Sequence, residues 1–254
     1  MQSDPTTRFT PRVEAYQRYR PSYPRDILLL LQREYGLARA SRVADIGCGT
    51  GLLARLFLDY GCEVFGVEPN PGMRASAEAS LAAEPRFHSI DGRAESTTLP
   101  DRAFDFVTAG QAFHWFEPAA AHGELRRILR SGGWLVLVWN ERRIEPGFQA
   151  GYDDIVREFA PETNRIREDA IGTVFGGHHW RLTEFPNQQL LDLAGLEGRV
   201  ASCSYAPLPG AAGYLPMTEA LAALFAEYQQ DGQVTLLYDT KVYWGRIVTP
   251  APGA

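Results

Sequence analysis

The chain has 254 residues, of which 45% are hydrophobic, and its 25 basic and 31 acidic residues give a net charge of −6. This length and apolar content suffice for one sizeable core, and we expect a single enlarged domain. The acidic balance, without a dense stripe of Lys and Arg, argues against a nucleic-acid or anionic-membrane partner. A small-molecule substrate is therefore expected.

The cysteines and the apolar runs predict a cytoplasmic protein. Cys48, Cys62 and Cys203 have neither an even count nor metal-ligand spacing, so we expect no disulfide framework and no metal site. The first residues lack the charged-then-apolar pattern of a secretion signal. The longest apolar runs, residues 27–31 and 135–139, are far too short to cross a membrane.

The first predicted elements are helical. Residues 1–10 are polar, residues 12–19 mix aromatic and basic side chains, and the two prolines in residues 20–24 interrupt any helix there. A helix is predicted over residues 25–35. Strand and helix patterns then alternate through Asn140, which predicts a doubly wound, mostly parallel sheet of the α/β class.

Residues 43–51 are the most informative stretch, because an apolar strand runs through Asp45 into Gly47, Gly49 and Gly51 before a helix. Alternate glycines let the backbone turn tightly and approach a ligand where a Cβ would collide. The following helix directs free N–H groups toward the same place. A nucleotide-like ligand is therefore expected at this turn.

The spacing of the turn and a second acid narrow the ligand. A dinucleotide turn has the pattern Gly-x-Gly-x-x-Gly, whereas Leu52 stands here in place of the third glycine. Glu68 ends the next apolar run, residues 62–67, where its carboxylate is placed to accept hydrogen bonds from both hydroxyls of a ribose. Glu68 alone fits a nicotinamide cofactor as well as an adenosyl one.

Three further motifs follow in order, at residues 91–95, 104–116 and 125–135. With the glycine turn they resemble the class I S-adenosylmethionine-dependent methyltransferases over roughly residues 12–140. The run at residues 112–116, Ala-Phe-His-Trp-Phe, is similar to a methyltransferase type 11 subgroup with trans-aconitate methyltransferase-like members. The resemblance implies a Rossmann-like, seven-stranded, mostly parallel sheet with an inserted cap. It also implies S-adenosyl-L-methionine as cofactor, S-adenosyl-L-homocysteine as product, and no metal.

The resemblance further implies a set of cofactor-binding residues. These are Asp45, Gly47, Cys48, Gly49, Gly51, Glu68, Pro69, Met73, Ala94, Glu95, Gln111 and Phe113. Asp45 is expected to orient the turn and the methionine ammonium, or else only to cap the turn. Family members often carry an acid beside the adenine-loop alanine, whereas this chain has Arg93 before Ala94. Glu95 is therefore expected to accept the hydrogen bond of the adenine amine, and Met73 packs either on adenine or in the core.

His114 is the candidate catalytic residue. It acts as a general base or as a hydrogen-bond donor to the substrate; the alternative is a histidine held between aromatic neighbours that only shapes the loop. A carboxylate acceptor is already ionised at pH 7 and needs no base, whereas a phenol or an amine does.

Several residues outside the core are substrate candidates. Tyr16, Tyr19, Arg20 and Tyr23 resemble an N-terminal lid that closes over the cofactor, with Arg20 offering a bidentate grip on a carboxylate. The alternative is a surface helix whose aromatic side chains pack on the sheet. Trp115 and Arg142 complete the set, Arg142 because it follows the fifth strand, where this fold carries its substrate specificity.

The alternation of strands and helices lapses after Asn140. We expect helices at residues 148–159 and 188–193, a strand at 200–205, a helix after Pro216 and a strand at 234–243. The expected organisation is a lid segment (1–24), a cofactor-binding core (25–140), an inserted cap (141–185), the completion of the core sheet (186–248) and a disordered tail (249–254).

These observations predict a methyltransferase that uses S-adenosylmethionine and methylates a small molecule, most readily at a carboxylate or hydroxyl oxygen of a carboxylic acid or phenol. Two alternatives stay open. One is an NAD(P)-dependent oxidoreductase, against which Leu52 argues; the other is a protein of this fold that binds the cofactor without transferring methyl. A monomer and a homodimer are both compatible with the sequence.

Overall fold

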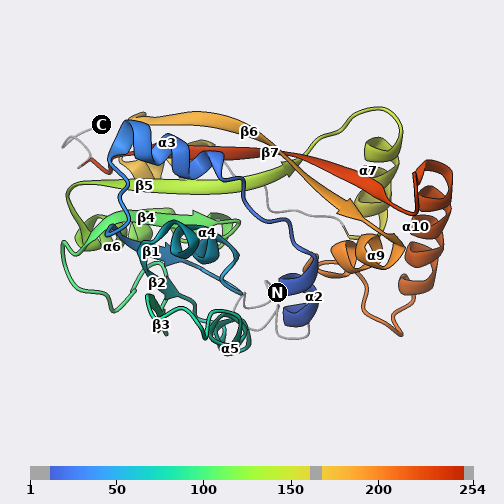
Figure 1. The fold of residues 1–254 in the computed structure, drawn as a ribbon, viewed down its shortest axis with the longest axis horizontal. Helices are drawn as coiled ribbons and strands as arrows, with labels where there is room; N and C mark the ends of the chain where they lie inside the picture. Colours follow the sequence, from blue (N-terminus) through green and yellow to red (C-terminus); the bar gives the residue numbers. More distant parts are fainter. Residues whose placement is uncertain (1–11, 161–167, 249–254) are drawn as a thin grey trace. The chain divides into compact units, whose positions relative to one another are not determined.

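The computed structural model describes residues 12–160 and 168–248 (Figure 1). The predicted disordered tail and residues 1–11 of the predicted lid segment lie outside the described residues. Within the described ranges, no helix is both long enough and apolar enough to cross a membrane.

Through residue 142 the described chain alternates strands with helices, as predicted, except that two strands follow one another between residues 87 and 110. The helices are α2 (Val13–Tyr19), α3 (Asp26–Tyr35), α4 (Leu52–Tyr60), α5 (Pro71–Ser80), the 3-10 turn η2 (Phe113–Trp115), α6 (Pro118–Ile128), α7 (Phe148–Phe159), α8 (Glu168–Phe175), α9 (Leu193–Ala201) and α10 (Tyr214–Tyr228). The strands are β1 (Arg42–Ile46), β2 (Glu63–Val67), β3 (Phe87–Ile90), β4 (Phe104–Gly110), β5 (Leu129–Arg142), β6 (Trp180–Leu191) and β7 (Val234–Gly245).

The seven strands form one sheet in the order β3-β2-β1-β4-β5-β7-β6, which confirms the predicted α/β fold. β1 pairs in parallel with β2 on one side and with β4 on the other, and β2 with β3 and β4 with β5 are also parallel. The chain therefore turns away in opposite directions on the two sides of β1. Ligands bind at such a switch point, outside the carboxyl ends of the strands.

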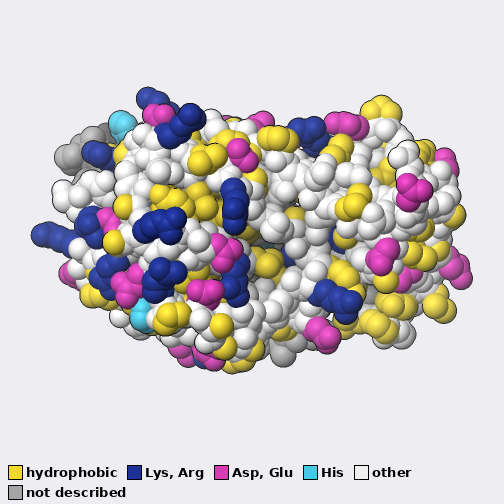
Figure 2. All heavy atoms as spheres, viewed as in Figure 1, with side chains coloured by type: hydrophobic (Ala, Val, Ile, Leu, Met, Phe, Trp, Pro, Cys, Tyr) yellow, Lys and Arg dark blue, Asp and Glu magenta, His cyan; other side chains and the backbone are white. Residues whose placement is uncertain are grey.

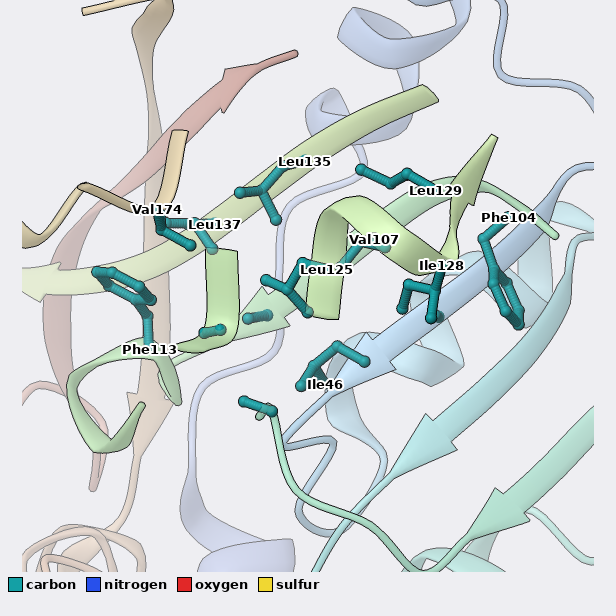
Figure 3. Packing of buried hydrophobic residues seen from close by; sticks show 14 of the residues in the cluster. Ile46, Phe104, Val107, Phe113, Leu125, Ile128, Leu129, Leu135, Leu137 and Val174 are labelled. Carbon is teal, nitrogen blue, oxygen red and sulfur yellow. The ribbon is translucent and has the colours of Figure 1, made fainter. Parts of the chain in front are cut away.

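Alternate residues of the central strands supply two separate cores, one on each face of the sheet. In β5, Leu135 and Leu137 join the cluster that includes α6 and α8, whereas Val136 and Val138 join the cluster that includes α3 and α4. Figure 3 shows side chains of α6 and β5 converging in the first cluster. Because both faces are covered by helices, these strands are apolar on both sides and hold the loops at their carboxyl ends rigidly.

The chain divides into two compact units. The first comprises residues 1–21, 140–165 and 186–239, and the second comprises residues 22–139, 166–185 and 240–254. The first unit has its own apolar core, to which α7, α9 and α10 contribute. The segment expected as a cap, 141–185, contributes to both units, because α8 buries Ile171, Val174 and Phe175 in a core of the second unit.

Two local predictions are wrong. Residues 188–191 belong to strand β6 rather than to a short helix; this strand lies at the end of the sheet order and buries few side chains, so it lacks an apolar alternation. The predicted strand at residues 200–205 overlaps the end of helix α9. The Asp192 carboxylate accepts from the Gly195 N–H at 2.7 Å and caps that helix, which extends through Val200 despite its β-branched side chain.

Candidate functional site

Asp45 lies near the end of β1 and is completely buried. Its Oδ1 accepts a hydrogen bond from the Thr108 hydroxyl of β4 at 2.8 Å. Burial raises the pKa of Asp45 to about 7; the Thr108 hydroxyl and the nearby Ala54 N–H lower it, and the charge of Glu68 raises it. Oδ2 has no hydrogen-bond partner within the described part of the chain. A buried acid with an unpaired oxygen is therefore present at the switch point of the sheet.

The turn after β1 depends on its glycines for two different reasons. Gly47 has φ +68°, and a Cβ there would lie 2.6 Å from the Ala112 Cβ of the loop after β4. Gly49 has φ +57°, but a Cβ there would meet no protein atom within 4 Å. Gly47 thus allows two loops to pack together, whereas Gly49 faces open space. Gly51, with φ +86°, is the N-cap of α4.

Glu68 follows β2 and links three segments of the site. One carboxylate oxygen accepts from the Gly49 N–H at 2.9 Å, and the other accepts from the Asn70 N–H at 2.9 Å. Arg74 donates to the Glu68 carbonyl oxygen at 2.8 Å. Burial raises the pKa of the Glu68 carboxyl, while the two N–H groups and the Arg74 charge oppose the shift. The glycine turn and the β2 loop are therefore held at one edge of the sheet.

The other predicted residues of this edge are held by local contacts. Met73 is buried, and its N–H donates to the Asn70 side chain that caps α5. Ala94 is buried in the loop after β3, and the Glu95 carboxylate accepts from the Glu117 N–H at 2.8 Å. Pro69, beside Glu68, is half-buried. Cys48 is a buried free thiol, and burial raises its pKa.

The loop after β4 packs directly on the glycine turn. Gln111 has φ +54°, a conformation that costs a non-glycine residue energy, and its N–H donates to the Val138 carbonyl of β5. Phe113 is 1% exposed and forms an edge contact with the ring of Phe116. The strained residue therefore begins the loop after β4 and is fixed to strand β5.

His114 and Trp115 lie in η2 within an aromatic group. The centroid of the His114 ring is 4.6 Å from that of Trp115 and 5.0 Å from that of Trp139 on β5. Both residues are half-buried. This packing fixes the plane of the imidazole without identifying it as a proton carrier.

Tyr23 and the other lid candidates fall into different units. Tyr23 belongs to the second unit, and a Cβ on Gly110 would lie 2.6 Å from its hydroxyl, so Tyr23 closes over the end of β4. Tyr16, Tyr19 and Arg20 belong to the first unit. There the Arg20 guanidinium lies 4.9 Å from the Tyr16 ring centroid and donates to the Ser202 carbonyl, and the Gln189 amide donates to the Tyr19 carbonyl.

Arg142, the remaining substrate candidate, forms an ion pair with Asp153 of α7 at 3.1 Å. The Asp153 side chain is only 9% exposed, and it also binds Arg157. The Arg142 guanidinium further lies 5.9 Å from the ring centroid of Tyr152. Within the first unit, Arg142 is therefore held by an acid and an aromatic ring.

Four residues of the site were not predicted from the sequence. Thr108 binds Asp45, Asn70 accepts from the Met73 N–H, and Ala112 and Phe116 pack against Gly47. Asn70 offered a sequence signal, since Asn before Pro is a common helix cap. The contacts of Thr108 and Phe116 join segments far apart in the chain, and no local pattern marks them.

The geometry fits an adenosyl cofactor. A buried Oδ2 of Asp45 lacks a partner, and the Thr50 hydroxyl in the same turn is also buried without a hydrogen-bond partner among the described residues. Unpaired buried polar atoms are rare, and a bound ligand that supplies hydrogen-bonding groups accounts for them. The open space beside Gly49 leaves room for such a ligand next to Glu68.

The comparisons with known proteins agree with the fold and the turn. The methyltransferase-domain family matches residues 44–137. An uncharacterized methyltransferase of Mycobacterium bovis is 36% identical over 204 residues, which are 80% of this chain and 79% of that protein. The malonyl-[acyl-carrier protein] O-methyltransferase of Enterobacter lignolyticus is 34% identical over 141 residues, 55% of this chain and 54% of that protein.

Among solved structures, a putative type II methyltransferase from Anaeromyxobacter dehalogenans superposes with a TM-score of 0.66 at 23% identity, covering 92% of this chain and all of that one. The trans-aconitate methyltransferase-like subgroup stays a prediction. The extent of the Mycobacterium match, together with the strand order, places this chain in the methyltransferase-domain family, with the fold of the class I S-adenosylmethionine-dependent methyltransferases.

Proposed function

We propose that this protein binds S-adenosylmethionine at the glycine turn and transfers its methyl group to an oxygen of a small molecule, leaving S-adenosylhomocysteine. The observation that carries the proposal is the unpaired, buried Oδ2 of Asp45 beside the carboxylate of Glu68. A buried carboxylate oxygen without a hydrogen-bond partner is costly unless a ligand compensates it. A ligand that presents a cation and a pair of hydroxyls provides that compensation.

The two acids have different tasks in this proposal. Asp45 Oδ2 accepts from the ammonium of the methionine portion, while Oδ1 stays bound to Thr108. Glu68 accepts from the ribose hydroxyls with lone pairs that the Gly49 and Asn70 N–H groups leave available, because each carboxylate oxygen can accept more than one hydrogen bond.

The remaining predicted contacts follow the order of the loops. Met73, Ala94 and Glu95 border the adenine, and Gln111 and Phe113 border the methionine end. These assignments rest on the family resemblance and on the positions of the residues after β2, β3 and β4. Tyr16, Tyr19, Arg20 and Tyr23 stay proposed lid residues, and Trp115 and Arg142 stay proposed substrate contacts.

When bound, S-adenosylmethionine supplies a methyl group on a positively charged sulfur. The protein then has to place the acceptor oxygen in line with that methyl group and exclude water. Positioning of this kind supplies on the order of 7–11 kcal/mol in favourable cases. Phe113 and Phe116 contribute an apolar, water-excluding wall next to the turn.

An oxygen acceptor is favoured for two reasons. A carboxylate is already ionised at pH 7, so methyl transfer to it needs no general base. The relative from Enterobacter, moreover, is by name an O-methyltransferase. Carboxylic acids and phenols are accordingly the acceptors to test first. A cytoplasmic location and the absence of nucleic-acid partners stay predictions from the sequence.

Calorimetric titration with S-adenosylmethionine and S-adenosylhomocysteine tests the cofactor. We expect micromolar binding by the wild type. In Glu68→Ala the affinity should fall by roughly 10²-fold or more, because ribose contacts and the clamp on Gly49 are lost together. Glu34→Ala, at an exposed position on α3, is the matched control and should bind as the wild type does.

Titration with NADH separates the rival oxidoreductase. If the wild type binds NADH and not S-adenosylmethionine, the proposal is wrong. Release of S-adenosylhomocysteine in the presence of a carboxylic acid or a phenol then tests transfer itself. Cofactor binding without product release from any acceptor of either class would favour the protein that binds without transferring methyl.

A further inference from the structure

A pocket whose walls are rich in arginine lies in the second unit. It has a volume of about 690 Å³, within the range of small-molecule sites. Its charged lining residues are Asp101, Arg102, Arg126, Arg127, Arg130 and Arg246. Five cations face one acid at this place on a chain whose net charge is −6.

Two of the five arginines have structural partners. Arg127 bonds to Glu124 and to Asp101, and Arg130 forms an ion pair with Asp105 at 2.6 Å. The pKa of Glu124 is lowered to about 2, chiefly by its hydrogen bonds from Arg127. Burial raises this pKa, whereas hydrogen bonds from the Thr97 hydroxyl and N–H lower it further. Arg127 therefore ties the turn before β4 to the end of α6, and Arg130 ties the start of β5 to β4.

The other three arginines of the pocket differ from these two in their exposure and in their partners. Arg102, Arg126 and Arg246 are exposed, and none of them forms an ion pair with an acid of the described residues. Arg102 has φ +49°, and its backbone N–H donates to the Arg127 carbonyl oxygen at 2.9 Å, which holds the backbone in this conformation. The Arg246 guanidinium lies 4.8 Å from the ring centroid of Trp134. Three guanidinium groups therefore surround one pocket without neutralisation.

The pocket is distinct from the cofactor site. Arg102 precedes β4, and residues 129–133 are the first of β5, so the pocket lies at the amino ends of these parallel strands. The glycine turn, Glu68 and Gln111 all follow the carboxyl ends of their strands. β4 advances two residues, from Phe104 to Phe106, while β5 advances five, from Leu129 to Trp134. Residues 130–133 therefore bulge from the sheet and form one wall.

We propose that this pocket binds a diphosphate-bearing small molecule through Arg102, Arg126 and Arg246. Arginine forks match phosphate oxygens in pairs, and a diphosphate presents several charged oxygens within the span of one ligand. The volume exceeds what a single phosphate fills, and Leu129 and Ile247 offer apolar contact for the rest of the molecule.

Favourable interaction of arginine with a helix C-terminus accounts for only part of the arrangement. Arg126 and Arg127 lie in the last turn of α6, where cations are stabilised. Arg102 and Arg246 come from other elements, before β4 and after β7, and gain nothing from that helix. Figure 2 shows basic side chains mostly over elements of the second unit on the visible face, interspersed with acidic ones.

Calorimetry with inorganic pyrophosphate tests the site, and Trp134 provides a second signal. We expect one saturable site in the submillimolar range, and a change in tryptophan emission as Arg246 moves from the Trp134 ring to the anion. Arg126→Ala and Arg246→Ala should each weaken binding roughly tenfold, as expected for one lost charge-assisted bond. Trp134→Phe should abolish the emission change while binding persists.

Arg33→Ala, which removes an exposed arginine of α3, is the control and should bind pyrophosphate as the wild type does. ADP binding more tightly than pyrophosphate identifies a nucleotide; equal binding identifies the diphosphate alone as the recognised group. Stronger binding of citrate than of pyrophosphate, no saturation, or an equal loss in Arg33→Ala would overturn the proposal. S-adenosylmethionine titrations of the same variants should be unchanged, so this test is independent of the proposed methyl transfer.

Discussion

The two compact units bury charged groups in opposite ways. In the second unit, Asp45 is completely buried and its Oδ2 has no hydrogen-bond partner among the described residues. In the first unit, Arg199 is 2% exposed, its Nε donates to the Tyr238 hydroxyl at 3.0 Å, and its Nη1 donates to the Cys203 sulfur at 3.4 Å. The Tyr238 hydroxyl donates onward to Gln189 at 2.7 Å.

This difference distinguishes a ligand site from a structural network. A buried group whose bonds are made within the protein stabilises the fold and gains nothing from a ligand. A buried acid with an unpaired oxygen lowers the stability of the fold until a ligand binds. The bound ligand relieves this cost, which adds to its affinity. The same degree of burial therefore has opposite consequences, and substitutions in the two units should change stability with opposite signs.

Asp45→Asn should give the largest effect, through pH. The folded-state pKa of about 7 lies above the ordinary value, so the native state binds more protons than the unfolded state between about pH 4 and 7, and stability falls as pH rises through that window. The cost approaches about 4 kcal/mol above pH 7. Near pH 8 we expect Asp45→Asn to unfold at higher urea concentration than the wild type, in the absence of cofactor.

Cofactor affinity should show the same titration. If the ionised Asp45 binds the ammonium, the Kd of the wild type for S-adenosylmethionine should rise up to tenfold for each pH unit below about 7 and be flat above it. In Asp45→Asn this dependence should disappear and binding should be weaker at every pH. An unchanged pH dependence in the variant would assign the titration to another group.

The glycine turn contains both a structural position and a ligand-facing position within one unit. Gly47→Ala places a Cβ 2.6 Å from the Ala112 Cβ at φ +68°, and should cost about 3 kcal/mol of unfolding free energy. Gly49→Ala, at φ +57° with no atom within 4 Å, should cost only about 1 kcal/mol. Cofactor binding should nevertheless weaken in Gly49→Ala, because the new methyl group enters the proposed ligand space. Equal losses of affinity and stability in the two variants would contradict this division.

Tyr238→Phe tests the structural network of the first unit. The substitution removes the acceptor of the Arg199 Nε–H and the donor to Gln189, so the buried Arg199 and the half-buried Gln189 each lose a hydrogen bond. We expect a loss of about 2 kcal/mol in unfolding free energy by urea denaturation. Affinity for S-adenosylmethionine should not change. Phe148→Leu, a substitution of similar burial in the same core, gives the effect of packing alone.

The sequence was sufficient for those parts of the site that a local pattern encodes. Glycine spacing and an acid at a strand end predicted the turn, Asp45 and Glu68, because backbone conformation and ligand access constrain residues close in the chain. The roles of Thr108 and Phe116 could not be predicted, since they arise where β4 and its loop meet β1 and its turn. The register of the sheet decides those contacts.

The fold of the second unit was easier to predict than that of the first for the same reason. Its central strands are buried on both faces and read as apolar runs, whereas Leu191 is the one fully buried residue of β6 and α9 begins at an unrecognised Asp192 cap. The network around Arg199 gave no signal either. A single arginine in a helix resembles a surface residue until its partner Tyr238 on β7, which donates onward to Gln189 on β6, is known.

His114→Gln should have the smallest effect and decides between the two interpretations of that residue. The ring packs on Trp115 and Trp139, an arrangement that supports a role in shaping the loop. With a carboxylic acid as acceptor, we expect kcat to fall less than about tenfold and the pH profile of kcat/KM to keep its shape, because the nucleophile is already ionised. With a phenol, a general base would be required. If His114 were that base, its removal would lower kcat roughly 10²–10⁴-fold, and the acid limb of the kcat/KM profile would disappear. A large loss with a carboxylate acceptor as well would place His114 in substrate binding, and a Kd for S-adenosylmethionine equal to that of the wild type would show that the turn is intact.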